Sequence, residues 1–160
     1  MATQVRTTKL DRGNEVIIET ITITSADAST NFKIDLPPGM YELAFIVYSA
    51  ATMNTANSTV GGIAPYLDAA QTIVADTPFG IYDADDVYSS AVATTYTLAN
   101  ASTAAKYFVL NGLFGSVSTI LGTAGEHGPF VLPYGLRVSF TKSGTPNAGS
   151  VTLVVVARRV

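Results

Sequence analysis

The chain has 160 residues, of which 48% are hydrophobic and 13% are charged, a balance that excludes an intrinsically disordered protein and predicts one folded domain. Its net charge is −3 and it has no lysine- or arginine-rich run, so sequence-independent nucleic-acid binding is not expected. The absence of cysteine excludes disulfides, thiolate metal sites and cysteine nucleophiles.

The first 14 residues are polar and show no hydrophobic periodicity. They contain three basic residues, Arg6, Lys9 and Arg12. We interpret residues 1–14 as a short flexible N-terminal arm outside the core, and residues 15–160 as the single domain. A frayed terminus and a partner-binding arm both fit this composition.

Strand signals follow the arm. Residues 15–24 (EVIIETITIT) are rich in β-branched side chains and predict a strand. Residues 31–36 alternate apolar and polar side chains, which predicts a strand with one buried face. A Pro-Pro-Gly turn at 37–39 leads into a third strand within 40–48, whose second half is apolar on both faces.

The middle of the chain is less regular. Glycine and proline interrupt residues 58–80, where 64–71 is the one candidate for a short helix. A strand is expected at 94–98 and a loop at 100–104.

The last third predicts strands at 106–114, within 131–142 and at 150–160. Alternation places Leu136, Val138 and Phe140 inward on the second of these strands, and Val151, Leu153, Val155 and Ala157 on one face of the third. The turn-forming residues at 143–150 predict that the last two of these strands pair as an antiparallel hairpin. Because no segment has a sustained helical stripe, the pattern predicts an all-β sandwich or barrel of about eight strands.

Three carboxylates lie close together in FGIYDADDVY: Asp83, Asp85 and Asp86. Calcium needs six or more oxygen ligands, and the glycine and late glutamate of an EF-hand loop are missing here. Neighbouring positions on one loop also fail to provide the separated carboxylates of acid–base catalysis. We favour a solvated loop or a subunit contact over a metal site.

His127 is the only histidine in the sequence. Structural zinc sites use several cysteine or histidine ligands, and no Gly-x-Ser-x-Gly elbow is present to supply a nucleophile. The glycine-rich stretches lack the spacing of a phosphate loop or a dinucleotide fingerprint. We therefore predict no catalytic, cofactor-binding or metal-binding residues, and no enzymatic activity.

Aromatic residues number fifteen, eight tyrosines and seven phenylalanines, without tryptophan. Four tyrosines fall in the irregular middle and are candidates for exposure: Tyr66, Tyr82, Tyr88 and Tyr96. Tyrosine is favoured at protein interfaces, and we prefer that interpretation to a sugar-binding platform. Near the C-terminus, Arg158 and Arg159 either aid solubility or pair with an acidic neighbour.

The charge-poor, cysteine-free composition, the polar N-terminal segment, the strand LPYGLRVSF (132–140) and the closing SGTPNAGSVTLVVVARRV (143–160) resemble small structural proteins of tailed-bacteriophage virions, in particular capsid decoration (cement) proteins. The resemblance implies a jelly-roll-like antiparallel β-sandwich that assembles as a homotrimer. It also implies that copies, assembled in the host cytoplasm, bind the major capsid protein lattice at the outer capsid surface of the virion and stabilise the shell. The N-terminal arm would reach across the lattice or a neighbouring subunit.

The residues expected to contact a partner are Arg6, Lys9, Arg12, Tyr82, Tyr88, Arg158 and Arg159. The alternative function is a carbohydrate- or receptor-binding β-sandwich of a phage tail or fibre. No window approaches the ~18 consecutive apolar residues of a membrane span, so no membrane partner is expected.

Overall fold

A computed structural model describes residues 1–51, 58–76, 78–83, 94–98, 105–111, 129–144 and 149–160. Within these ranges the chain forms eleven β-strands and no α-helix. The strands are β1 (Thr3–Asp11), β2 (Asn14–Thr24), β3 (Thr30–Ile34), β4 (Gly39–Ala51), β5 (Thr59–Pro65), β6 (Gly80–Asp83), β7 (Thr95–Thr97), β8 (Lys106–Asn111), β9 (Phe130–Leu132), β10 (Leu136–Thr141) and β11 (Ser150–Arg159). The same ranges contain no helix of the length and apolarity that crossing a membrane requires.

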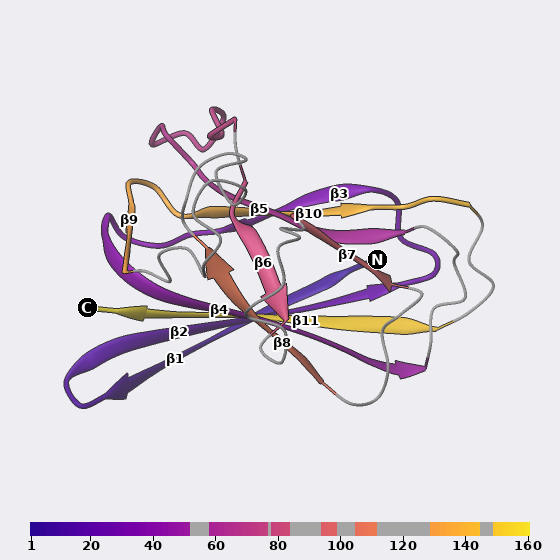
Figure 1. The fold of residues 1–160 in the computed structure, drawn as a ribbon, viewed down its shortest axis with the longest axis horizontal. Helices are drawn as coiled ribbons and strands as arrows, with labels where there is room; N and C mark the ends of the chain where they lie inside the picture. Colours follow the sequence, from indigo (N-terminus) through magenta and orange to yellow (C-terminus); the bar gives the residue numbers. More distant parts are fainter. Residues whose placement is uncertain (52–57, 77, 84–93, 99–104, 112–128, 145–148) are drawn as a thin grey trace.

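The strands form two antiparallel sheets, which confirms the predicted all-β sandwich (Figure 1). The larger sheet has seven strands in the order β1-β2-β11-β4-β8-β6, with β9 pairing the beginning of β4. The smaller sheet has the order β3-β10-β5-β7 and lies above the larger one in Figure 1. The described strands exceed the expected eight because β1, β6 and β9 are added at the margins of the larger sheet.

The strand pairs are nested along the chain. Strand β2 pairs with β11, β3 with β10, β4 with β8, and β5 with β7. The chain therefore folds back on itself about a midpoint between β5 and β7. Further pairs, β11 with β4 and β10 with β5, join the two halves of this long hairpin within each sheet.

The core lies between the sheets and is filled by alternate residues of each strand. On β11, the inward residues Val151, Leu153, Val155 and Ala157 are at most 1% exposed, as their period-two pattern predicted. The predicted inward residues of β10, including Val138, are buried as well. Burying each large apolar side chain contributes about 1.5–3 kcal/mol, so this alternation supplies most of the driving force for the fold.

The structure corrects the prediction that the N-terminal segment is a flexible arm. Residues 3–11 are strand β1, which pairs with β2 along its whole length. The turn between them has positive φ at both Arg12 (53°) and Gly13 (83°), the pattern of a two-residue hairpin turn. All nine β1 side chains are exposed, so neither face needs apolar residues and the sequence shows no period.

The predicted hairpin around 143–150 is also wrong. Strand β10 lies in the four-stranded sheet between β3 and β5, whereas β11 lies in the seven-stranded sheet between β2 and β4. The chain between them passes from one sheet to the other. Each of the two strands is paired on both sides with strands from the first half of the chain, so neither has an edge left for the other.

The irregular middle contains strand β5, and the range expected to be a short helix, 64–71, is the end of this strand followed by a turn. Gly61 and Gly62 both have positive φ within this strand. A Cβ on Gly61 would lie 2.5 Å from the carbonyl oxygen of Thr94, so only glycine allows β7 to approach so closely. Glycine at this position, which in the sequence argued against a regular element, is therefore what allows β5 to pair with β7.

Candidate partner-binding surface

The outward faces of the two sheets differ in composition. The four-stranded sheet carries polar outward side chains: Asn31, Lys33, Arg137, Ser139 and Thr141. The outer face of the seven-stranded sheet is apolar over part of its area, where six half-buried side chains lie on neighbouring strands: Val16, Ile18, Ala44, Ile46, Val154 and Val156. The same strands continue with threonines: Thr20, Thr22, Thr24 and Thr152. Val5 and Tyr107 extend this apolar face and are 61% and 48% exposed.

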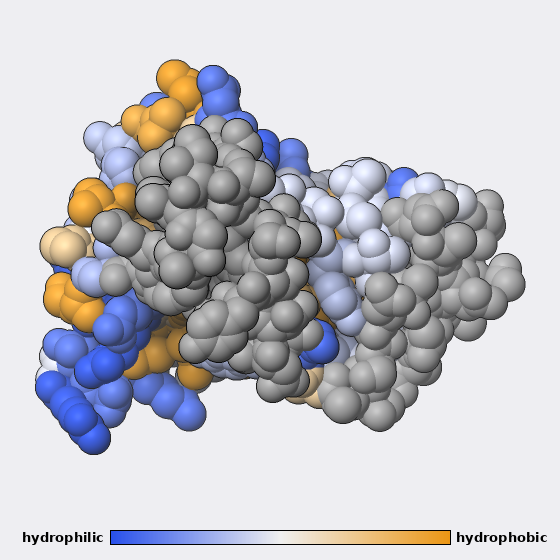
Figure 2. Space-filling view, viewed as in Figure 1, coloured by the Kyte–Doolittle hydropathy of each residue, from blue (hydrophilic) through white to orange (hydrophobic). Residues whose placement is uncertain are grey.

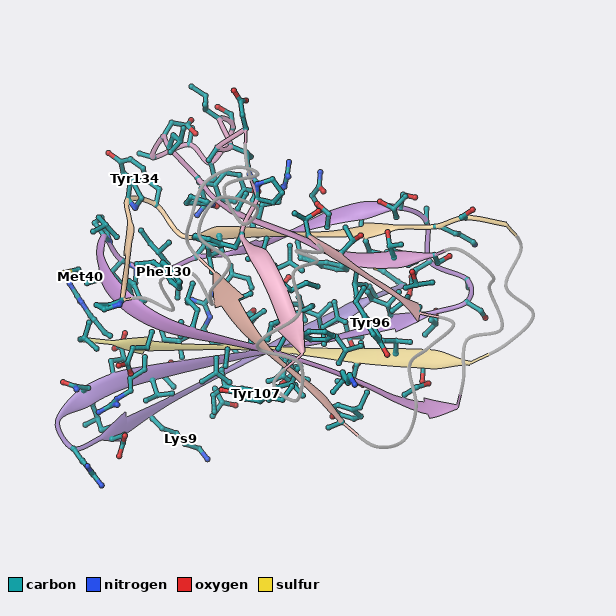
Figure 3. All side chains as sticks on the ribbon, in the orientation of Figure 1. Lys9, Met40, Tyr96, Tyr107, Phe130 and Tyr134 are labelled. Atoms are coloured by element: carbon teal, nitrogen blue, oxygen red, sulfur yellow. The ribbon has the colours of Figure 1, made fainter. Side chains whose placement is uncertain are left out.

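One end of the sandwich gathers most of the exposed apolar residues. Of the nine large hydrophobic residues exposed in the described part of the chain, six lie here: Leu10, Met40, Leu67, Ile73, Val131 and Val160. We call these six residues the end surface. Met40 pairs with Val131, and the Val160 amide donates to the Met40 carbonyl at 3.1 Å. Figure 2 shows hydrophobic and hydrophilic atoms side by side at this end, on the left of the view, and Figure 3 labels Met40 there.

A hydrogen-bonded turn carries two residues of the end surface, Leu67 and Ile73. The Leu67 amide donates to the Ile73 carbonyl at 2.9 Å, which closes the turn. The carboxylate of Asp68 accepts from the Ile73 amide at 2.7 Å and from both the amide and the hydroxyl of Thr72. These hydrogen bonds, the Ile73 amide first, lower the pKa of Asp68. The exposure of Leu67 and Ile73 is thus a property of a fixed turn.

The same turn is tied to the rest of the fold by Gln71. This residue has φ of 54°, and its side-chain amide donates to Asp35 at 2.6 Å and to the Tyr134 carbonyl at 2.9 Å. Figure 3 labels Tyr134 beside the end surface. The turn is therefore joined to the residue that follows β3 and to the segment between β9 and β10.

A hollow of about 300 Å³ opens on the end surface. Its lining residues are Leu10, Gly13, Asn14, Glu15, Arg159 and Val160. Leu10 and Val160 are 79% and 51% exposed and provide apolar walls. Arg159 also donates to the Pro38 carbonyl at 3.1 Å. An apolar side chain of a partner could enter this hollow with charged groups at its margin.

Arg158 lies at the edge of the end surface and pairs with two carboxylates of its own chain. Its guanidinium is 3.2 Å from Glu42 and 3.6 Å from Asp11. Of the two interpretations of this residue, an acidic neighbour within the same chain fits these contacts. All three side chains are substantially exposed, so each pair contributes about 0.2–1 kcal/mol at most. Lys9 and Arg12 stand nearby on β1 and its turn, both exposed.

Arg6 has a different role from the other basic residues. Its Nε donates to Glu19 at 2.7 Å, and the Glu19 side chain is only 4% exposed. The Gln4 side-chain amide donates to the other Glu19 oxygen at 2.7 Å and to the Lys33 carbonyl of the opposite sheet at 2.8 Å. Arg6 and Gln4 thus fasten β1 to the sandwich. A signal for this pairing is present in the sequence. The alternation of residues 15–24 places Glu19 on the inward face, where a carboxylate needs a partner.

Several predicted residues fall outside the described residues or have side chains that are not described. Asp85, Asp86, Tyr88 and His127 lie outside them, and Tyr82 and Asp83 are described only as backbone in β6. Elsewhere in the described ranges, no group of three or more histidine or acidic side chains is placed to hold a metal ion.

One candidate tyrosine is buried in the core, and a second is partly buried against it. Tyr66 is 3% exposed, and Tyr96 packs edge-on against Phe108 with ring centroids 5.1 Å apart. Neither provides the exposed ring that a sugar platform needs. This weakens the carbohydrate-binding alternative at these two tyrosines.

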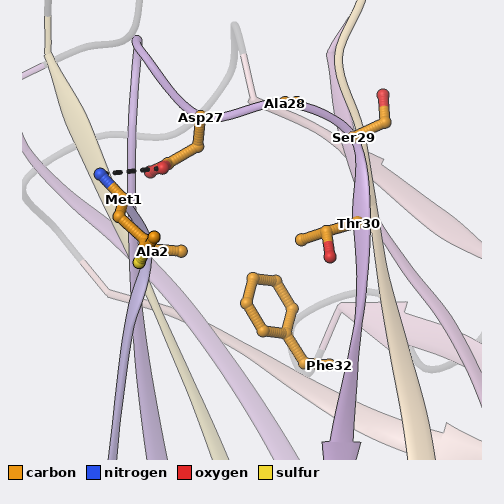
Figure 4. Close-up of a pocket in the computed structure, with 7 residues that line it drawn as sticks. All are labelled: Met1, Ala2, Asp27, Ala28, Ser29, Thr30 and Phe32. Carbon is orange, nitrogen blue, oxygen red and sulfur yellow. Dashed lines mark ion pairs between the residues drawn. The ribbon is translucent and has the colours of Figure 1, made fainter.

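A second hollow, away from the end surface, is lined by Asp27 and residues close to it in space (Figure 4). There the Met1 ammonium is 3.1 Å from Asp27, and the hollow, which Phe32 also lines, has a volume of about 320 Å³. Burial by itself would raise the pKa of Asp27, but the hydrogen bonds from Thr24 and the nearby ammonium outweigh it and lower this pKa. Because the Asp27 carboxylate is already paired within the chain, this hollow is a weaker candidate for partner binding than the end surface.

Comparison with protein families, curated proteins and solved structures finds no match to this chain. Its function is therefore argued from the chemistry of its surfaces.

Proposed function

We propose that the protein is a non-enzymatic structural protein of a tailed-bacteriophage virion, a capsid decoration protein that attaches to the outer capsid surface through its end surface. The observation that carries this proposal is the concentration of exposed apolar residues and arginines at one end of the sandwich. Its partner is the lattice of the major capsid protein.

The end surface has the composition of a protein interface. Interfaces combine an apolar centre with a charged rim, and they are enriched in methionine and arginine. Here Met40 and Val131 lie within the apolar patch, while Arg158 and Arg159 lie at its margin. This distribution favours attachment to another protein over catalysis on a small molecule.

The nested strand order supports a jelly roll as the detailed architecture. A jelly roll consists of eight strands in two sheets, an arrangement that recurs in viral capsid and lectin domains. The sets β2-β11-β4-β8 and β3-β10-β5-β7 provide those eight strands. This order agrees with the resemblance to virion proteins noted from the sequence.

Attachment in many copies makes a modest contact sufficient. When copies are themselves joined, as in the trimer implied by the resemblance, each further contact forms at high effective concentration. Stable decoration then needs no single strong site. Such copies would be assembled onto the capsid in the host cytoplasm and would bridge neighbouring capsid subunits.

The test is co-sedimentation of the full chain with capsids assembled from the major capsid protein encoded in the same genome. We expect binding, with Val131→Asp reducing the affinity at least about tenfold because a charge enters the apolar centre. The matched control is Thr141→Asp, which places the same charge on the exposed outer face of the four-stranded sheet. Absence of binding, or equal loss in both variants, would contradict the proposal.

A further inference from the structure

Strand β1 is a long sheet edge whose side chains are all exposed. It is nine residues long and lies at the end of the strand order, with β2 as its one neighbour in the described part of the chain. The edge of such a strand presents a row of unpaired N–H and C=O groups that can template another strand.

The turn between β1 and β2 determines which main-chain groups face outward. Asp11 pairs with Asn14 across the two-residue turn. In an antiparallel ladder closed this way, the pair beside the turn exchanges both hydrogen bonds, and every second residue does the same. The residues between them direct their N–H and C=O groups away from β2. These residues are Gln4, Arg6, Thr8 and Leu10.

The edge lacks most of the devices that normally prevent pairing. Strand β1 contains no proline, and its register with β2 runs without a shift. Of its three charged residues, Arg6 is engaged by Glu19 and Asp11 lies beside Arg158. Lys9 is the remaining charge on the strand.

We propose that β1 pairs antiparallel with β1 of a second copy of this chain, about a two-fold axis that passes beside Thr7. In this register Arg6 lies opposite Thr8, Gln4 opposite Leu10, and Lys9 opposite Val5 of the second copy. All four outward-facing residues of each strand form hydrogen-bonded pairs. No two like charges lie directly opposite each other.

Neighbouring registers are less favourable. Centring the axis on Arg6 places two guanidinium groups opposite each other, which is destabilising. Centring it on Thr8 uses only three of the four outward-facing residues. Shifting the register by one residue brings outward-facing groups opposite inward-facing ones, so the hydrogen bonds cannot form.

This self-complementarity favours a second copy over an unrelated strand. The pairing joins two seven-stranded sheets into one continuous sheet and aligns their apolar outer faces. It is an isologous contact, in which the same residues serve both partners. The inference uses neither the end surface nor the capsid, so it stands independently of the proposed function.

The first test is disulfide cross-linking of Thr7→Cys in the full chain. Because the parent has no cysteine, every disulfide formed is intermolecular. Directly opposed residues of a non-hydrogen-bonded pair have Cα atoms about 4.5 Å apart, within the range of about 4.4–6.8 Å that a disulfide spans. We expect a disulfide-linked dimer under mild oxidation.

The matched controls are Val5→Cys and Lys9→Cys, which lie on the same exposed face of β1. In the proposed register each is offset from its own copy by four residues, about 13 Å, and cannot form a disulfide. The double variant Val5→Cys with Lys9→Cys restores opposed cysteines and should cross-link. Equal cross-linking of Thr7→Cys and the single controls would overturn the register.

The second test is Thr8→Pro, with the molar mass measured by light scattering. Proline removes an outward N–H without removing a bond to β2, so the fold should persist and the two-fold contact should be lost. The parent should show the mass of two copies, or a whole-number multiple of it such as the six copies of two joined trimers, and the variant half that mass. A monomeric parent, or a trimer that Thr8→Pro leaves unchanged, would overturn the proposal.

Discussion

The two sheets of this sandwich face the core in the same way but face outward differently. The four-stranded sheet carries lysine, arginine, serine and threonine on its outer face, as a water-facing sheet does. The seven-stranded sheet carries valine and isoleucine outward, and its edge strand β1 extends the sheet with all nine side chains exposed. The outer faces of the two sheets therefore differ in how much apolar surface they present to their surroundings.

The largest expected effect distinguishes two neighbours on β11. Leu153 faces the core and is fully buried, whereas Val154 faces outward and is half-buried. We expect Leu153→Ala to lower the free energy of unfolding by about 2–5 kcal/mol, and Val154→Ala by less than about 1 kcal/mol. Urea denaturation measures both. Similar losses would show that the outer face is as well packed as the core within one copy.

A second prediction concerns the attachment of β1 to the sandwich. Arg6→Ala leaves the buried Glu19 carboxylate with Gln4 as its remaining side-chain donor among those described. We expect a loss of about 1–3 kcal/mol, discounted because the Arg6 side chain is 37% exposed. The control is Arg12→Ala at the exposed turn, where less than about 0.5 kcal/mol should be lost. Equal losses in the two variants, measured in urea, would contradict the role of Arg6.

A third prediction concerns the corner that joins the two sheets. Asp27 follows β2 and accepts hydrogen bonds from Thr24, and its pKa is lowered in the folded state. A lowered pKa stabilises the fold above the unfolded value of about 3.9, and this stabilisation is lost as the pH falls through the folded value.

Asp27→Asn should therefore be less stable than the parent at neutral pH, by about 1 kcal/mol. The difference should shrink below about pH 4, where the parent loses the same contribution. Thermal unfolding at pH 7 and at pH 3 measures this. A difference that stays constant with pH would show that the Asp27 carboxylate does not act through its charge.

The smallest effect is expected at the outward charges of the larger sheet. Arg158 contacts Glu42 and Asp11, and both carboxylates are exposed while Arg158 itself is 33% exposed. Arg158→Ala should lower the free energy of unfolding by no more than about 1 kcal/mol, and 1 M salt should remove most of that difference. A larger loss that persists in salt would place this residue in the packing of the fold.

Local periodicity predicted much of this fold. The alternation in β3, β10 and β11 identified the buried faces, and the inward residues of β11 are those that the period-two pattern indicated. Side-chain alternation belongs to a single strand, so it can be recognised without knowledge of the neighbours. The absence of a helical stripe was sufficient to predict an all-β chain.

Pairing between distant strands could not be predicted in this way. The final two strands are adjacent in sequence but belong to different sheets, because each pairs with strands from the first half of the chain. Strand β1 carried no periodic signal, since neither of its faces is buried. The end surface combines residues from five separate segments, which only the tertiary structure brings together.

The sequence by itself determined the strand class, the inward faces and the poverty of charge, because these depend on composition and on neighbouring residues. The tertiary structure decided which sheet each strand joins, that Arg6 is paired with a buried carboxylate, and that Met40 and Val160 share one surface with Leu67. Those features depend on contacts between residues far apart in the chain. Such contacts are selected by the packing of the whole core, which no single segment encodes.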